Sequence, residues 1–235
     1  MTTADPDPPA PPTPAGGAVR RYYPVVLDVA GRPCLVVGGG RVGARKVRGL
    51  VDCGASVTVV APDVVPAIAA LAEAAPGLDP PAAVTVRRRP YRAGEAARYR
   101  LVVTATGVAA VDRAVVADAQ AAGVWVNTAD DPRHGTFFLP SVHRDGPVTV
   151  SVSTGGSSPA LAAWLRRRLA AAVGPEVGVL AGLLDEARRR VAAEGRPTEA
   201  VDWQAILDGP LPDLVAAGHL DEAKALLAAA TAPVD

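Results

Sequence analysis

The feature that most restricts the fold is the stretch 34–43, where an apolar run breaks into glycines and then enters a helical pattern over 41–51. Gly38, Gly40 and Gly43 have the spacing of the dinucleotide fingerprint G-x-G-x-x-G. The first glycine allows a tight turn, the second lets the backbone approach a pyrophosphate, and the third lets the helix pack against the strand. The phosphates would lie at the free N–H groups of the helix N-terminus. Because glycine-rich turns are common, the interpretation depends on what surrounds this one.

Strands and helices alternate around the glycine turn, which supports nucleotide binding. Apolar runs rich in β-branched residues predict strands at 21–28, 34–37, 56–60, 83–87, 101–104 and 124–126, and helical patterns lie at 41–51, 64–75 and 111–122. This alternation predicts an α/β fold with a Rossmann-type parallel sheet covered on both faces.

The rhythm changes in the second half of the chain. Runs at 136–139 and 147–152 are strand-like without long helices between them, and Ser158 is a natural N-cap with Pro159 at the first helical position. Helical composition then dominates, at 161–172, 176–194, 198–207 and 221–230. We therefore expect a Pro-rich leader (1–19), a dinucleotide-binding domain (20–132), a small α+β element (133–172) and a helical C-terminal domain (173–235).

Composition narrows the class of protein. The 24 Lys and Arg balance the 24 Asp and Glu, so no global field attracts nucleic acid or an anionic membrane. Cys34 and Cys53 lack C-x-x-C spacing and only three histidines occur, so buried cysteines and no resident metal site are expected. Any mechanism that needs a lysine must use Lys46 or Lys224. The leader lacks the features of a signal peptide and no run reaches transmembrane length, so a cytoplasmic protein is expected.

Ligands of open α/β sheets bind beyond the carboxyl ends of the strands, which selects the cofactor candidates. The second strand ends in Val60-Ala61-Pro62, without the acidic residue that usually holds the NAD ribose, and Asp63 comes slightly late. No arginine stands there for a 2′-phosphate, so NAD is favoured over NADP. The expected cofactor contacts are Gly38, Gly39, Gly40, Arg41, Val42, Gly43, Ala61, Pro62, Thr104 and Thr106.

The loop after the fifth strand, 127–134, is the most polar of those at the carboxyl edge. A carboxylate there would lie near the nicotinamide end of the cofactor and could accept a proton during oxidation. Asp130 and Asp131 can equally be turn residues before Pro132, and His134 is a rival base because its ordinary pKa of about 6.5 suits proton transfer.

Two further features can bind anions or be purely structural. The glycine-rich turn 154–158 precedes a helix and can bind a carboxylate or phosphate, or simply cap that helix. The arginine runs 87–89 and 166–168 can hold an acidic substrate, although such runs are more often solvated faces.

Several linked motifs together resemble the precorrin-2 dehydrogenases of sirohaem synthesis, including the dehydrogenase/ferrochelatase module of sirohaem synthases. They are Tyr23-Pro-Val, Cys34-Leu-Val-Val-Gly-Gly-Gly with Arg45-Lys46, Asn127-x-x-Asp130-x-Pro132, Phe137-x-x-Pro140 and Ser153-Thr-Gly-Gly-Ser-Ser-Pro159. The resemblance covers about 23–172, with a looser helical tail.

The resemblance implies an NAD-dependent oxidation of precorrin-2, a tetrapyrrole with many carboxylates, to sirohydrochlorin. It implies a homodimer formed through the middle segment 133–172 and, in some members, insertion of ferrous iron. The family's catalytic aspartate falls on Asp130. The expected substrate contacts are Asn127, His134, Thr154, Gly155, Gly156 and Ser157.

One position departs from the family pattern, and the residues also allow two other functions to be weighed against it. Gly107 stands where many relatives have an acidic or amide residue, which weakens the expected side-chain contacts to the nicotinamide half. A module that senses NAD without chemistry is the alternative function. A reductase of the Tyr-x-x-x-Lys type is excluded, because no tyrosine has a lysine four positions on.

Overall fold

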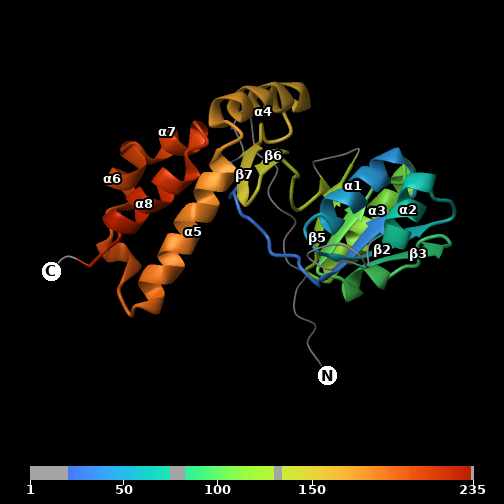
Figure 1. The fold of residues 1–235 in the computed structure, drawn as a ribbon. Coiled ribbons are helices and arrows are strands. Elements are labelled where there is room, and N and C mark those ends of the chain that lie inside the picture. Colours follow the sequence, from blue (N-terminus) through green and yellow to red (C-terminus); the bar gives the residue numbers. More distant parts are fainter. Residues whose placement is uncertain (1–20, 75–82, 130–133, 234–235) are drawn as a thin grey trace. The chain divides into compact units, whose positions relative to one another are not determined.

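The computed structural model describes residues 21–74, 83–129 and 134–233. The chain forms two compact units, Met1–Leu139 and Pro140–Asp235, and each is considered by itself (Figure 1). The finer division predicted from the sequence, with a separate segment 133–172, stays a prediction.

The first unit is built on a five-stranded sheet in the order β3-β2-β1-β4-β5, with all neighbouring strands parallel. This is the strand order of a Rossmann half, and it confirms the predicted α/β class. The strands are β1 Pro33–Val37, β2 Ser56–Ala61, β3 Ala83–Arg88, β4 Leu101–Thr104 and β5 Trp125–Thr128.

Helices cover both faces of this sheet (Figure 1). Side chains of β1 alternate between two apolar clusters: Cys34 and Val36 pack with helices α1 and α2, whereas Leu35 and Val37 pack with α3 and the 3₁₀-helix η2. Burial on both faces explains why this strand is apolar without interruption. The helices are α1 Arg41–Val51, α2 Pro66–Ala74, η2 Glu95–Arg98 and α3 Ala109–Ala121.

The second unit joins an antiparallel hairpin to a group of helices. Strands β6 Ser141–Asp145 and β7 Val148–Val152 pair with each other, and helix α4 Pro159–Val173 packs on them. The other α-helices of this unit share an apolar core that includes Leu183, Ile206 and Leu211. They are α5 Val177–Ala193, α6 Trp203–Asp208, α7 Leu211–Ala216 and α8 Leu220–Ala230. The 3₁₀-helix η4 Thr198–Ala200 lies between α5 and α6 in the sequence and has no buried residue.

Two segments predicted as strands are irregular. Residues 21–28 have no strand partner in the described part of the chain, and Val26 is 97% exposed. At 136–139 the backbone does not continue a ladder, because the Thr136 side chain and N–H both bond to Val126. Phe137 packs instead against the core on the α1 side. In both cases an apolar pattern was present, but it did not lead to a strand in the structure.

Candidate functional site

The glycine turn between β1 and α1 is tightly packed on one side and open on the other. Gly38 has a φ of +123°, and a Cβ there would overlap the carbonyl of Ala105. A Cβ at Gly43 would overlap the carbonyl of Gly38. A Cβ at Gly40, by contrast, would meet nothing within 4 Å. The turn therefore leaves free space at the position where the fingerprint brings a pyrophosphate against the backbone.

The start of α1 is suited to an anion. Its N-cap is Gly40, which offers no side-chain cap, and its first turn contains no acidic residue. Arg41 begins the helix with a positive charge at the positive end of the helix dipole, which is unfavourable unless an anion lies nearby. The N–H groups of this first turn can bind the phosphates of a dinucleotide. The geometry thus fits the expected cofactor contacts Gly38–Gly43.

The loop after β2 packs over the glycine turn. Ala61, at the end of β2, is buried and Pro62 is exposed. The Val65 N–H donates to the Gly39 carbonyl at 2.9 Å, and a Cβ at Gly39 would overlap the carbonyl of Asp63. Gly39 is therefore needed for the approach of two backbone segments, a role that its place in the fingerprint did not reveal.

A carboxylate that the sequence did not single out organises the loop after β4. Asp112 in α3 accepts hydrogen bonds from the hydroxyl of Thr104, and from the hydroxyl and N–H of Thr106 at 2.8 and 3.3 Å. Thr104 is fully buried, so its hydrogen bond with Asp112 ties the loop to the interior of the unit. The separation of Thr104 and Asp112 along the chain gave no signal before the fold was known.

Gly107, the departure from the family pattern, lies in the same loop. Its φ is +70°, in the left-handed region that favours glycine, and a Cβ would meet nothing within 4 Å. The backbone conformation of this loop is a physical reason for glycine at this position.

Asn127 lies within β5, not in the loop beyond it, and is only 5% exposed. Its Nδ2 donates to the Phe137 carbonyl at 3.0 Å, and its Oδ1 accepts from the Lys46 ammonium at 3.3 Å. Burial lowers the pKa of Lys46, and the charge of Arg45 lowers it further. The expected role of Asn127 as a substrate contact stays a prediction, and the contact with Lys46 was not foreseen.

Of the other residues expected in the polar loop, the structure describes only some. Asp130 and Asp131 lie outside the described residues. His134 is exposed, and its carbonyl accepts from Gln120 Nε2 at 3.1 Å.

The turn 154–158 belongs to the second unit. Thr154 Oγ1 accepts from the Ser158 N–H at 3.1 Å, and Ser158 Oγ accepts from the Leu161 N–H at 3.2 Å. Gly155 and Gly156 have positive φ values, of +61° and +86°, and Ser157 is exposed. The predicted N-cap at Ser158 is confirmed. The roles of Thr154, Gly155, Gly156 and Ser157 in substrate binding stay predictions.

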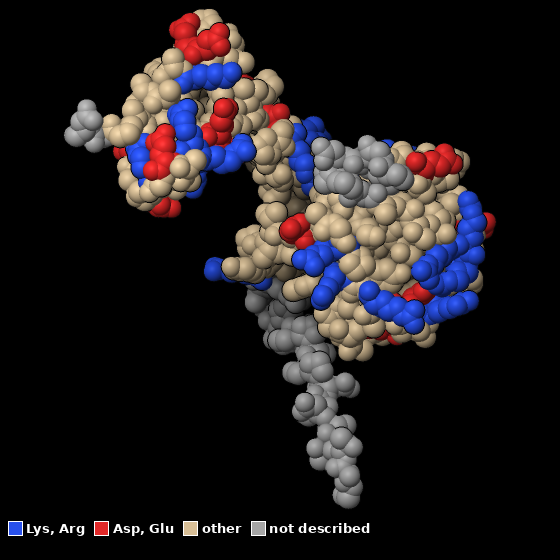
Figure 2. Space-filling view, turned by 60° about the horizontal axis from the view of Figure 1, so that its bottom comes forward, with Lys and Arg blue, Asp and Glu red and all other residues tan. Residues whose placement is uncertain are grey.

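The arginines of the first unit differ in how they are engaged. Figure 2 shows Lys and Arg side chains in clusters on one face of this unit, with few acidic groups among them. Arg89 forms a two-pronged pair with Glu95, at 2.9 and 2.6 Å, so it is not available to a ligand. Arg87 and Arg88 on β3 are exposed.

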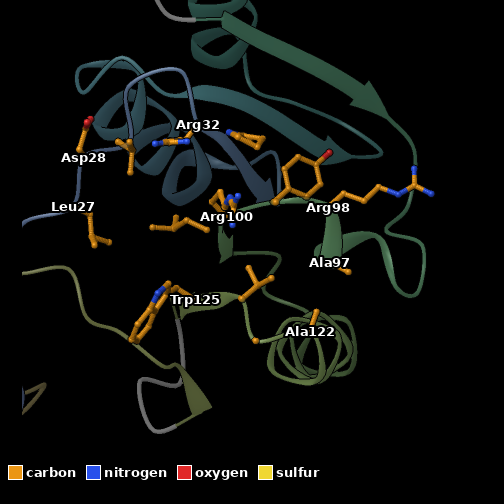
Figure 3. Close-up of a pocket in the computed structure, with 14 residues that line it drawn as sticks. Leu27, Asp28, Arg32, Ala97, Arg98, Arg100, Ala122 and Trp125 are labelled. Atoms are coloured by element: carbon orange, nitrogen blue, oxygen red, sulfur yellow. The ribbon is translucent and has the colours of Figure 1, made fainter.

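A cavity of about 730 Å³ lies at the opposite, amino edge of the sheet, by the starts of β1, β4 and β5 (Figure 3). Arg32, Arg100 and the half-exposed Trp125 line it. It is separate from the glycine turn, so it does not belong to the expected cofactor site.

The described residues contain no helix with the length and apolar composition needed to cross a bilayer. They also contain no group of three or more His, Cys, Asp or Glu placed to hold a metal ion.

Comparisons with known proteins add to this geometry. Residues 25–141 match the family model for NAD(P)-binding, and residues 145–172 match the model described as sirohaem biosynthesis protein, central. The chain is 37% identical to the sirohaem synthase of Methylococcus capsulatus over 88% of this chain and 42% of that protein. It is 38% identical to the sirohaem synthase of Chromobacterium violaceum over 87% of this chain and 42% of that protein. The chain thus spans less than half the length of these relatives.

A solved structure of a precorrin-2 dehydrogenase has a similar fold. The TM-score is 0.66 at 25% sequence identity, and the similarity covers 89% of this chain and 98% of that one.

Proposed function

Because the chain belongs to the sirohaem biosynthesis proteins that join an NAD(P)-binding segment to a sirohaem central segment, we propose that it oxidises precorrin-2 to sirohydrochlorin with NAD. The observation that carries the proposal is the open glycine turn at the start of an uncapped α1, in a chain that also holds the central segment. A module that only senses NAD is not favoured, because these relatives are named as enzymes.

In this mechanism the first unit binds and orients the reactants. Bound NAD would be the oxidant: it would accept a hydride, that is two electrons and one proton, from the macrocycle, while a second proton leaves the substrate. The N–H groups at the start of α1 hold the pyrophosphate, and the loop fixed by Asp112 positions the nicotinamide half. Asp130, two residues beyond the end of β5, accepts the departing proton.

The substrate carries several carboxylates, so its contacts should be hydrogen-bond donors. Asn127 and His134 in the first unit, and the turn from Thr154 to Ser157 in the second, are the proposed contacts. We also propose that two copies associate through the segment 133–172, in which Leu161 and Trp164 of α4 are each 46% exposed. Ferrous iron is a proposed second substrate, which the nitrogens of the macrocycle would receive. We place the reaction in the cytoplasm.

The test is an anaerobic incubation of the purified protein with enzymatically made precorrin-2 and NAD. The visible absorption spectrum of the mixture monitors the formation of sirohydrochlorin. We expect sirohydrochlorin to form only when NAD is present. No spectral change in a protein shown to bind NAD would reject the dehydrogenase and favour the sensing module. Ferrous iron added afterwards, beside a control without protein, tests chelation.

Asp130→Ala tests the assignment of the base. We expect this variant to bind NAD normally and to lose most of its turnover. Near-normal turnover would move the role to Asp131 or His134.

A further inference from the structure

Lys46 is a partly buried cation whose hydrogen-bond partner among the described residues is the neutral side chain of Asn127. Its ammonium donates to the neutral Oδ1 of Asn127 at 3.3 Å, and the described residues show no carboxylate paired with it. Removing an ammonium group from water is unfavourable unless a charged or strongly hydrogen-bonding partner replaces the water. A neutral amide replaces only part of that hydration, so an additional acceptor with a negative charge would stabilise the ammonium.

The surroundings of Lys46 are also positive. Helix α1 carries Arg41, Arg45, Lys46 and Arg48 and contains no acidic residue. Of the three N–H bonds of the ammonium, one is used on Asn127, which leaves two donors for a ligand. A carboxylate is the group that best satisfies both the charge and these donors.

Asn127 fixes the direction of this contact. Its Nδ2 donates to the Phe137 carbonyl, so the amide oxygen must face Lys46. Asn127 pairs with Val103 one position before the last pair of β4 and β5, Thr104 with Thr128. The ammonium is thus held near the carboxyl edge of the sheet, where open α/β sheets bind their ligands.

We propose that Lys46 is a substrate-binding residue, whose ammonium holds one carboxylate of the tetrapyrrole at the β4–β5 end of the carboxyl edge while Asn127 orients it. This inference rests on the proposed function and adds to it a named anchor for the anionic substrate. The contact is an ion pair and involves no covalent step.

The two lysines of the chain allow a direct test by NMR. Protein labelled with ¹³C at lysine Cε gives two resonances, Lys46 and the exposed Lys224 on α8, and Lys224→Arg assigns them. On titration with sirohydrochlorin in the absence of NAD, we expect the Lys46 signal to shift and the Lys224 signal to stay. A Lys46 signal that does not move at saturation would overturn the proposal.

Kinetics provide the second measurement. Lys46→Met should raise the KM for precorrin-2 about tenfold or more, since a charged hydrogen bond is lost, with little change in NAD affinity. Lys46→Arg should keep a KM close to that of the parent protein, and Lys224→Met should behave as the parent protein. A purely structural role would instead weaken NAD binding and substrate binding together.

The two hypotheses fail in different ways. If the parent protein turns over precorrin-2 and Lys46→Met keeps its KM, only the anchor is rejected. If the parent protein neither binds sirohydrochlorin nor oxidises precorrin-2, the proposed function is rejected and the anchor with it.

Discussion

At the scale of single residues, the glycines of the fingerprint perform different tasks. Gly43 is surrounded by backbone, so a side chain there must displace the Gly38 carbonyl. Gly40 has an ordinary extended conformation, with a φ of −81°, and faces open space. The structure therefore distinguishes a glycine whose packing excludes a side chain from one that borders open space, where the ligand is expected.

This separation predicts opposite behaviour for two alanine variants. Gly43→Ala should lower the free energy of unfolding by about 1–3 kcal/mol, because the added methyl group overpacks the turn. Gly40→Ala should unfold like the parent protein, within about 0.5 kcal/mol, but bind NAD at least about tenfold more weakly, because the methyl group keeps the pyrophosphate from the backbone. Urea unfolding and calorimetric titration measure the two effects. Normal NAD binding by Gly40→Ala would contradict this division of roles.

At the scale of elements, Ser158 caps the N-terminus of α4. The adjacent Ser157 provides a matched control for this cap. Ser158 Oγ accepts the Leu161 N–H, whereas Ser157 is exposed and makes no such bond in the structure. Ser158→Ala should therefore reduce the free energy of unfolding by about 1 kcal/mol, and Ser157→Ala by much less. Chemical denaturation of both variants checks this. Equal losses would show that the hydroxyl of Ser158 does not cap the helix.

An ion pair joins Arg89, which directly follows β3, to Glu95 in η2. This pair should make the free energy of unfolding depend on pH. Burial raises the pKa of Glu95, but the hydrogen bonds from Arg89 and the Arg92 N–H, with the Arg89 charge, lower it by more, so its pKa lies below the ordinary 4.5. A carboxyl whose folded pKa is depressed stabilises the fold above its unfolded pKa, and this contribution is lost as the pH falls through the folded pKa.

Glu95→Gln should accordingly cost about 1–2 kcal/mol at pH 7, and the difference from the parent protein should shrink below about pH 4.5. Unfolding free energies measured between pH 7 and pH 3 test this. Glu73→Gln, at an exposed position on α2, is the matched control and should show little difference. A constant difference across this range would contradict the ion pair.

Elements with strong local signals could be predicted from the sequence. The helix 41–51 and the strand 101–104 agree with the structure residue for residue. Gly40 directly precedes the helix, whose apolar residues recur at helical spacing, and the strand is a continuous apolar run. Strand β6 was missed, because Ser141-Val-His-Arg-Asp has little apolar alternation. It forms a strand in the structure by pairing with β7. Helix α7 was also missed, because the prolines 210 and 212 obscure its six residues.

The site was predictable only where its residues are close in sequence. The resemblance to the sirohaem proteins is confirmed by the relatives, and a tight turn does join β1 to α1. The role of this turn in cofactor binding stays a prediction. The contact of Lys46 with Asn127 joins residues 81 positions apart, and Asp112 reaches back to Thr104 through the start of α3. Such pairings depend on which helix lies over which strand.

At the scale of the whole molecule, the expected cofactor site at the glycine turn belongs to the first of the two units, and helices α4 to α8 belong to the second. Trp125 lies in the first unit, and Trp164 and Trp203 lie in the second. The chain's three tryptophans therefore report on both units by fluorescence.

NAD should stabilise the first unit selectively. At about 100 times its Kd it should add about 2.7 kcal/mol to the free energy of unfolding reported by Trp125, in a variant with Trp164 and Trp203 replaced by Phe. The reciprocal variant, with Trp125→Phe, should show a smaller shift. Gly40→Ala serves as the control: at the same NAD concentration, about tenfold weaker binding reduces the effect to about 1.4 kcal/mol, and weaker binding reduces it further. A Trp125 signal that NAD does not shift would contradict cofactor binding in this unit.

The two outer strands of the large sheet bear on how the protein avoids self-association. A strand at a sheet edge exposes unpaired N–H and C=O groups that can recruit strands of other chains. On β3 this edge carries the charges of Arg87 and Arg88, and on β5 the N–H and C=O of Val126 are both occupied by Thr136. The arginine run therefore has a use that needs no ligand: together with Thr136 it protects the sheet against aggregation through its edges.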